Sequence, residues 1–119
     1  MNLDSPQSKL LLRLMSAASL RSDVLAANLV NQNTPGFQRR EVRFEDRLVK
    51  ELDRSNPRLD SVQPEVVVDA DAEEGANGNT VNMEKEVSAM RENRLLYELY
   101  ANILQGRTRL LELAIRDSR

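Results

Sequence analysis

The chain has 119 residues, 40% of them hydrophobic and 30% charged, which is enough for one compact domain with a small core. A formal net charge of -2, with no segment rich in Lys or Arg, argues against nucleic acid binding. The absence of His and Cys removes the commonest general base, the commonest metal ligands and every disulfide, so we expect no enzyme, no cofactor and no small-molecule substrate.

The first residues do not have the pattern of a cleaved signal peptide. Asp4 and Pro6 precede a mixed polar and apolar run, whereas a secretory signal needs a basic start and an uninterrupted apolar core. The longest unbroken apolar run, Val24–Ala27, is far shorter than the roughly 20 residues that cross a bilayer. We therefore expect a chain that is soluble before it assembles.

An N-terminal helix is expected over residues 8–33, where helix formers are frequent and Gly and Pro are absent. Steps of three and four place Leu10, Leu14, Ala17 and Val24 on one stripe, which other apolar residues widen: Leu11, Ala18, Leu25 and Leu29. This width indicates more than one neighbouring helix. The helix should end at Asn33-Thr34-Pro35-Gly36, because proline disfavours helical backbone in the residue before it.

Residues 34–79 are expected to be irregular. The pattern from Phe37 to Leu52 fits an extended piece followed by a short helix. From Asp53 to Asn79, prolines, glycines and acidic residues indicate a loop. The run Val66–Val68 fits one short strand, but a segment with so little core-forming sequence also fits disorder until a partner orders it, and disorder is favoured.

The C-terminal segment, residues 82–116, predicts a long helix with Asn82 as its N-cap. Apolar residues alternate by four and three, as in a heptad seam broken only by Arg94 and Thr108: Met83, Val87, Met90, Tyr97, Ala101, Leu104, Leu111 and Ile115. A second stripe lies beside this seam: Leu96, Tyr100, Ile103, Leu110 and Ala114. Gly106 predicts either a bend or a close helix crossing.

These elements predict a single domain over residues 1–119 with an all-α fold. The terminal helices would pack as a coiled-coil-like hairpin or bundle beside the irregular middle. A hairpin covers only part of each apolar face, so neighbouring subunits or another partner should cover the rest. The expected assembly interface contains residues of both helices: Leu10, Leu14, Ala17, Val24, Val87, Met90, Tyr97, Ala101, Leu104, Leu111 and Ile115.

The acidic residues do not form a convincing metal or catalytic site. Those at positions 69–74 lack the spacing of a calcium-binding loop, so a solvated acidic loop is the simpler interpretation. The acids of the C-terminal segment lie off its apolar seam and are expected to be solvated charges rather than a catalytic pair: Glu84, Glu86, Glu92 and Glu98.

Two strings of residues resemble motifs of bacterial flagellar proteins. The first closes the N-terminal helix: Ala27-Asn28-Leu29-Val30-Asn31-Gln32-Asn33-Thr34-Pro35-Gly36-Phe37. By residue type alone it is a helix end followed by a Pro-Gly turn. As a whole string it resembles the signature shared by rod, hook and related axial proteins, with Phe37 where Tyr is often found and Val30 where Ala is frequent.

The second string begins before the C-terminal helix and contains Gly78, Asn79, Val81, Met83 and Glu84, followed by Asn93 and Tyr97. By residue type it is a turn, a capping Asn and an amphipathic helix. In order and distance it resembles the start of the C-terminal helix in the FlgB family of proximal-rod proteins. The two resemblances cover roughly residues 10–44 and 78–115.

The resemblance implies a structural subunit of the flagellar rod, in which helix packing along a helical lattice transmits torque. It implies contacts with further copies, with rod proteins of the FlgC and FlgF type and with the FliE adaptor. It also implies passage through the type III export apparatus to the periplasmic rod without signal cleavage.

Two alternatives remain open. Another rod protein of the FlgC type shares the first string, although Met83-Glu84-Lys85-Glu86 favours FlgB. A cytosolic helical-bundle regulator or adaptor would also account for the heptads. If the seam mediates assembly, Leu104→Asp should block it, whereas Glu73→Lys should have a mild effect.

Overall fold

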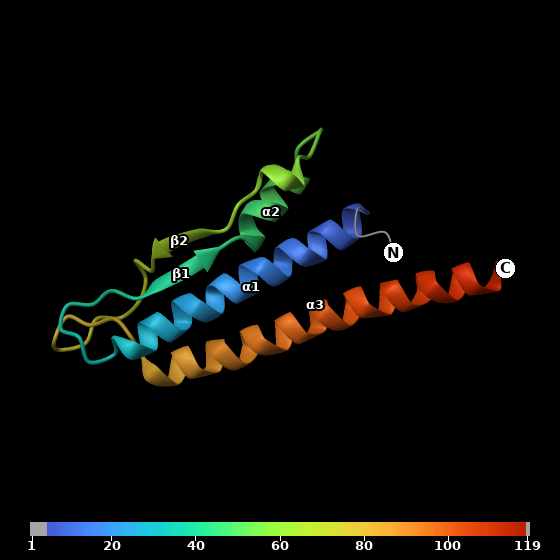
Figure 1. The fold of residues 1–119 in the computed structure, drawn as a ribbon. Helices are drawn as coiled ribbons and strands as arrows, with labels where there is room; N and C mark the ends of the chain where they lie inside the picture. The colour runs from blue at the N-terminus through green and yellow to red at the C-terminus, as the bar shows by residue number, and fades with distance from the viewer. Residues whose placement is uncertain (1–4, 119) are drawn as a thin grey trace.

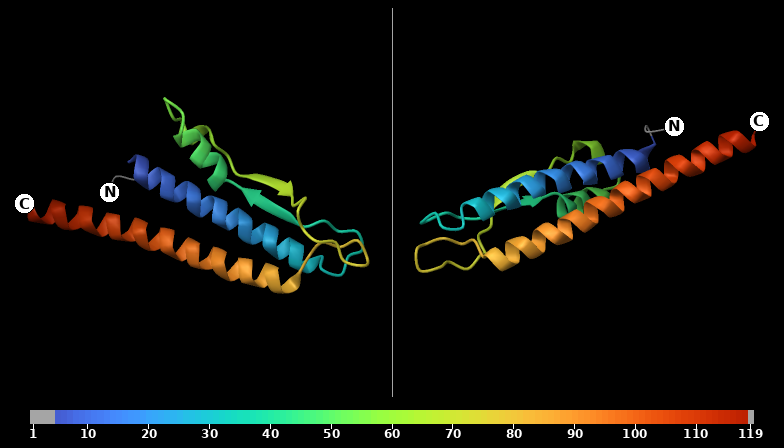
Figure 2. Two further views of the ribbon diagram at one scale, coloured as in Figure 1. Left: turned by 180° about the vertical axis from the view of Figure 1, so that it is seen from behind. Right: turned by 60° about the horizontal axis from the view of Figure 1, so that its bottom comes forward.

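A computed structural model of the chain describes residues 5–118. The molecule is long and thin, 67 × 32 × 14 Å, and α1 (Pro6–Val30) runs antiparallel to α3 (Met83–Asp117) along its length (Figure 1). The smaller elements lie on the opposite side of α1 from α3 (Figures 1 and 2): β1 (Arg40–Arg43), α2 (Glu45–Leu52), the 3-10 helix η1 (Leu59–Ser61) and β2 (Glu65–Val68). Helix α1 is therefore the central layer.

Helix α1 begins earlier and ends earlier than expected from the sequence. The Ser5 hydroxyl caps it by accepting a hydrogen bond from the Ser8 amide at 3.2 Å, and Pro6 occupies the first turn, where no amide hydrogen is needed. At the other end, Asn31 Nδ2 donates to the carbonyl of Ala27 at 2.8 Å. This bond adds to the one that the Asn31 backbone amide donates to the same carbonyl at 3.2 Å, so Asn31 caps the helix, which ends three residues before position 33.

Helix α3 is continuous over Met83–Asp117, and the Asn82 side chain caps it by accepting from the Lys85 amide at 3.1 Å. The helix continues through Gly106. A Cβ atom placed on Gly106 would meet no atom within 4 Å, so this glycine does not mark a close crossing within the described residues. The expectation of two long helices packed together is confirmed.

The all-α expectation is corrected by the middle segment, which contains a two-stranded antiparallel sheet. Strand β1 pairs with β2, with Arg40 opposite Val68 and Arg43 opposite Glu65. The valine run therefore forms a strand, and the segment expected to be disordered is organised around α1. β-Branched valines favour extended backbone, and β1 supplies the hydrogen-bonding partner that an isolated strand would lack.

A buried hydrophobic cluster lies between α1 and the middle segment. It contains Ala17, Phe44, Leu48 and Val62, with Leu10, Leu14 and Leu59 packed against it. Arg21 lies on the same face of α1 and forms a bidentate ion pair with Glu45 at 2.7 and 3.0 Å. This pair explains how a charged residue fits into the apolar stripe of α1.

No helix within residues 5–118 is both long enough and apolar enough to cross a membrane.

Candidate assembly surface

The two motif strings meet at the end of the molecule where the loop after α1 lies beside the loop before α3 (Figure 2). Asn79, which is buried, joins them. Its Nδ2 donates to the carbonyls of Asn31 at 2.9 Å and Thr34 at 2.7 Å, and its Oδ1 accepts from the Val81 amide at 2.7 Å. One amide side chain thus satisfies backbone groups of both loops.

Backbone hydrogen bonds reinforce this junction. The Gly36 amide donates to the Asn77 carbonyl, and the Thr80 amide donates to the Phe37 carbonyl, both at 3.0 Å. Gly36 and Gly78 have φ angles of 75° and 79°, a region that strongly favours glycine. The glycines of the two motifs therefore shape the loops that bring α1 and α3 together.

Alanine at these two glycines is expected to destabilise the chain by different amounts. A Cβ on Gly36 would meet no atom within 4 Å, whereas one on Gly78 would lie 3.4 Å from the Gly36 Cα. We expect Gly36→Ala to cost about 1–2 kcal/mol from its positive φ alone, and Gly78→Ala to cost more. Urea unfolding of the purified variants measures both values. Equal costs would contradict this close packing of the loops.

A buried polar network ties α1, the start of β1 and α3 together beside the loop junction. Glu86 of α3, 1% exposed, accepts hydrogen bonds from Nε and Nη2 of Arg39 and from Nδ2 of Asn28. Asn28 also pairs with the backbone of Arg40: its Nδ2 donates to the carbonyl at 2.8 Å and its Oδ1 accepts from the amide at 3.0 Å. Asn28 thereby holds β1 against α1.

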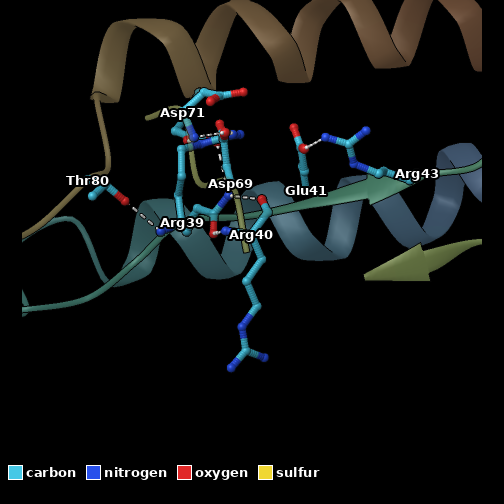
Figure 3. Close-up of polar contacts among 9 residues, drawn as sticks. Arg39, Arg40, Glu41, Arg43, Asp69, Asp71 and Thr80 are labelled. Atoms are coloured by element: carbon cyan, nitrogen blue, oxygen red, sulfur yellow. Dashed lines mark hydrogen bonds and ion pairs between the residues drawn. The ribbon is translucent and has the colours of Figure 1, made fainter. Parts of the chain in front are cut away.

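Arg39 is the centre of this network. Besides contacting Glu86, its Nη1 donates to Asp69 Oδ2 at 2.6 Å, and its backbone amide donates to Thr80 Oγ1 at 2.8 Å (Figure 3). Burial lowers the pKa of Arg39, but the hydrogen bonds and negative charges of Glu86 and Asp69 outweigh this effect and raise the pKa above its ordinary value. The guanidinium is therefore a permanent cation shared by two carboxylates.

The burial of Glu86 corrects the expectation that it is a solvated charge. Glu86 lies off the apolar seam of α3, as the sequence indicated, but the face it occupies is the one that packs on α1. A buried carboxylate is tolerated there because Arg39 and Asn28 supply its hydrogen bonds. No local pattern in the sequence links Arg39 to Glu86, since the pairing depends on the tertiary fold.

Polar residues occupy the face of α3 that packs on α1. Glu86 and Asn93 are buried, and Arg107, two further sevenfold steps along, is half-buried, with Tyr100 of the second apolar stripe between them. Asn93 Nδ2 donates to the Ala18 carbonyl at 2.7 Å, while Asn93 Oδ1 has no hydrogen-bond partner in the described part of the chain. No apolar side chain of α3 is fully buried within residues 5–118, since the buried positions of this helix are Glu86 and Asn93.

The apolar side chains of α3 instead remain open to solvent along much of the helix. Leu110, at 69%, is the most exposed of them. The exposed large apolar residues of α3 are Met83, Leu95, Tyr97, Leu99, Ile103, Leu110, Leu111, Leu113 and Ile115. Exposed apolar surface of this extent is typical of a helix face that takes part in protein contacts.

The expected interface residues fall into several groups in the structure. Leu10, Leu14 and Ala17 pack within the chain, against the cluster around Phe44. Val87, Met90 and Tyr97 line a groove between α3 and α1. Val24, Ala101 and Leu104 are half-buried, whereas Leu111 and Ile115 are exposed.

The remaining motif residues surround the loop junction without being deeply buried. Phe37, Gly78 and Val81 are half-buried, and the exposed ones are Ala27, Asn33, Thr34, Pro35, Gly36, Met83 and Glu84. Within residues 5–118 no group of three or more acidic side chains is placed to hold a metal ion.

The chain matches no protein-family profile. It is similar to curated proteins named flagellar basal body rod protein FlgB. The relative from Borreliella burgdorferi is 29% identical over 110 residues, covering 76% of this chain and 82% of the relative. The relative from Escherichia coli K12 is 29% identical over 104 residues, covering 72% and 75%, and that from Bacillus subtilis is 22% identical over 107 residues, covering 78% and 80%. These matches extend over most of each chain.

Proposed function

We infer that this chain belongs to the FlgB family of flagellar basal body rod proteins and is a structural subunit of the rod. The observation that carries this conclusion is the match to proteins of that name in several bacteria, each over more than two thirds of both chains. The meeting of both motif strings at one structural junction supports it, because Asn79 of the second string donates hydrogen bonds to the carbonyls of Asn31 and Thr34 in the first.

The shape of the chain agrees with a role in assembly. Its accessible surface is 8586 Å², whereas a compact monomer of this size would expose about 6,500 Å². Its radius of gyration is 18.3 Å, against about 13.5 Å for a compact domain of this length. The surplus of roughly 2,000 Å² is comparable to the area that a specific protein interface buries. Neighbouring subunits would cover this surplus.

The subunit acts by packing and not by catalysis. The chain contains no His or Cys, and its buried carboxylate, Glu86, accepts hydrogen bonds from Asn28 and Arg39 that hold α1, β1 and α3 together. Torque would pass along the rod through the lateral contacts of its long helices. Because rigid, well-packed helices transmit force without local unfolding, stability of the α1–α3 pair is part of the function.

We further propose that the chain lies in the periplasmic part of the basal body, which it reaches through the type III export apparatus without losing a signal peptide. Its contacts there would be with other copies, with rod proteins of the FlgC and FlgF type, and with the FliE adaptor. The unpartnered apolar side chains of α3 supply a surface for these contacts. The name of the relatives favours FlgB over the FlgC alternative.

Deletion of the coding region tests the function directly. We expect cells without the protein to lose swimming motility in soft agar, and a plasmid copy to restore it, because a missing rod subunit interrupts assembly. Normal motility of the deletion strain would contradict the rod assignment.

A further inference from the structure

The loop before α3, at one tip of the molecule (Figure 2), contains the single Asn-Gly pair of the sequence, Asn77-Gly78. The backbone nitrogen of a residue that follows asparagine can attack the side-chain carbonyl carbon of that asparagine. Glycine at the second position has no Cβ to hinder this attack and leaves the backbone free to turn. Because both reacting groups belong to one chain, the attack needs no enzyme to bring them together. Asn77 is exposed, so water also reaches it.

We propose that Asn77 is a site of spontaneous deamidation and that the closed loop junction protects it. The Gly78 nitrogen forms a bond to Cγ of Asn77 while the bond between Cγ and Nδ2 breaks. The proton of the Gly78 amide leaves with Nδ2 as ammonia, and a succinimide ring remains. Water then adds to one of the two ring carbonyls and reopens the ring, which gives aspartate or isoaspartate. No oxidation or reduction takes place, and water is the only co-reactant.

The peptide group that joins Asn77 to Gly78 is held at both ends in the folded chain. Its amide donates to the Gly75 carbonyl and its carbonyl accepts from the Gly36 amide, both at 3.0 Å. The attack consumes the amide hydrogen and requires the peptide group to turn toward the Asn77 side chain. Both hydrogen bonds must therefore break before the ring closes, and one of them crosses the junction between the two loops.

The side chain of Asn77 is itself prepared for the attack. Its Oδ1 accepts a hydrogen bond from the Asn79 amide at 3.2 Å. Negative charge develops on this oxygen as the new bond forms, and an amide donor stabilises such a charge. The folded loop thus presents the carbonyl carbon but holds back the nitrogen that attacks it. The rate is set by opening of the junction, which Asn79 closes through its bonds to Asn31 and Thr34.

Isoaspartate at position 77 would disrupt the junction permanently. It routes the backbone through Cβ and Cγ, which lengthens the chain between residues 77 and 78, and it leaves the former backbone carbonyl as a free carboxylate. The bonds that this peptide group makes to Gly36 and Gly75 then lose their geometry. Deamidation before the chain folds should therefore reduce the stability of the folded product.

Peptide mass spectrometry tests the site by measuring aspartate and isoaspartate at position 77 after incubation of the purified chain in slightly alkaline buffer, with and without guanidinium chloride. We expect deamidation to be at least about ten times slower in the folded chain than in the unfolded one, because two hydrogen bonds hold the reacting peptide group. Asn102 is an internal reference that should stay unmodified, because the β-branched side chain of Ile103 hinders the attack. No modification of Asn77 in the unfolded chain would overturn the site, and equal rates in the two states would overturn its protection.

Asn79→Ala tests the role of the junction, since it removes the side-chain bonds between the two loops. The folded variant should deamidate at Asn77 several times faster than the unchanged chain, and circular dichroism verifies that it is folded. Asn56→Ala, an exposed position in another loop, is the matched control and should leave the rate unchanged. If Asn79→Ala does not fold, Gly36→Ala provides a second way to weaken the junction. A folded junction variant that deamidates no faster than Asn56→Ala would contradict protection by the junction, whereas the rod function does not depend on this result.

Discussion

Replacing Glu86 with alanine is expected to destabilise the isolated chain by about 3–5 kcal/mol, because it removes one partner from a buried ion pair. Arg39 would keep Asp69 but lose both oxygens of Glu86, and Asn28 Nδ2 would keep only the Arg40 carbonyl. A domain of this size is typically stable by only about 5–15 kcal/mol, so the loss would be large. Urea unfolding followed by circular dichroism measures it.

Two further variants make this prediction specific. Glu92→Ala removes an exposed acid from the same helix and should change stability by less than about 0.5 kcal/mol. Combining Glu86→Leu with Arg39→Met removes both charges and should recover much of the loss, because a buried ion pair can be replaced by apolar residues at little cost. If Glu86→Ala and Glu92→Ala were equally mild, the network would not hold α3 in place.

Leu110→Asp is expected to abolish swimming while leaving the isolated chain folded. Leu110 is 69% exposed, so an aspartate there should alter the stability of the chain by no more than about 0.5 kcal/mol. In the assembled rod the same charge would lie within apolar surface without a partner, which is strongly unfavourable. Swimming in soft agar and urea unfolding of the purified variant separate the two effects.

Gln105→Asp is the matched control, since it adds the same charge to an exposed polar position of the same helix. It should swim normally, as should Glu73→Lys in the acidic loop. Leu104→Asp is less informative than Leu110→Asp, because Leu104 is half-buried and a charge there would affect folding and assembly together. Normal swimming of Leu110→Asp would show that this part of α3 is not an assembly surface.

The long helices were predictable because their signals are local. The signals are uninterrupted helix formers, the capping Asn82 and the Pro35-Gly36 turn, and each depends on neighbouring residues only. The expected ends of both helices therefore differ from the observed ends by one to three residues. The two motif strings were also recognisable one at a time. Their meeting through Asn79 was not, because a side chain that bonds to another loop leaves no periodic pattern.

The faces of the helices were harder to assign. The periodicity of apolar residues locates the apolar side of a helix, and this side is usually expected to be buried within the chain. In α3 the side that packs on α1 is instead polar, centred on Glu86 and Asn93, and the apolar side is left outward. The stripe on α1 is divided between two partners: Leu10, Leu14 and Ala17 pack on the middle segment around Phe44, whereas Ala18 and Leu29 line the contact with α3.

The middle segment was predictable only in part. An extended piece followed by a short helix was expected after Phe37, and β1 and α2 lie there. The pairing of β1 with the valine run was not expected, because three of the four residues of β1 are charged and give no signal of a buried strand. Strand pairing joins residues far apart in the sequence, so only the tertiary fold reveals it.

The most direct test of the rod assignment is to purify flagellar basal bodies from cells that express the tagged chain in place of the untagged one. We predict that the tagged protein co-purifies with the basal bodies and stays with them after washing in high salt, because apolar helix packing is not screened by ions. Its absence from basal bodies isolated from fully motile cells would contradict the assignment.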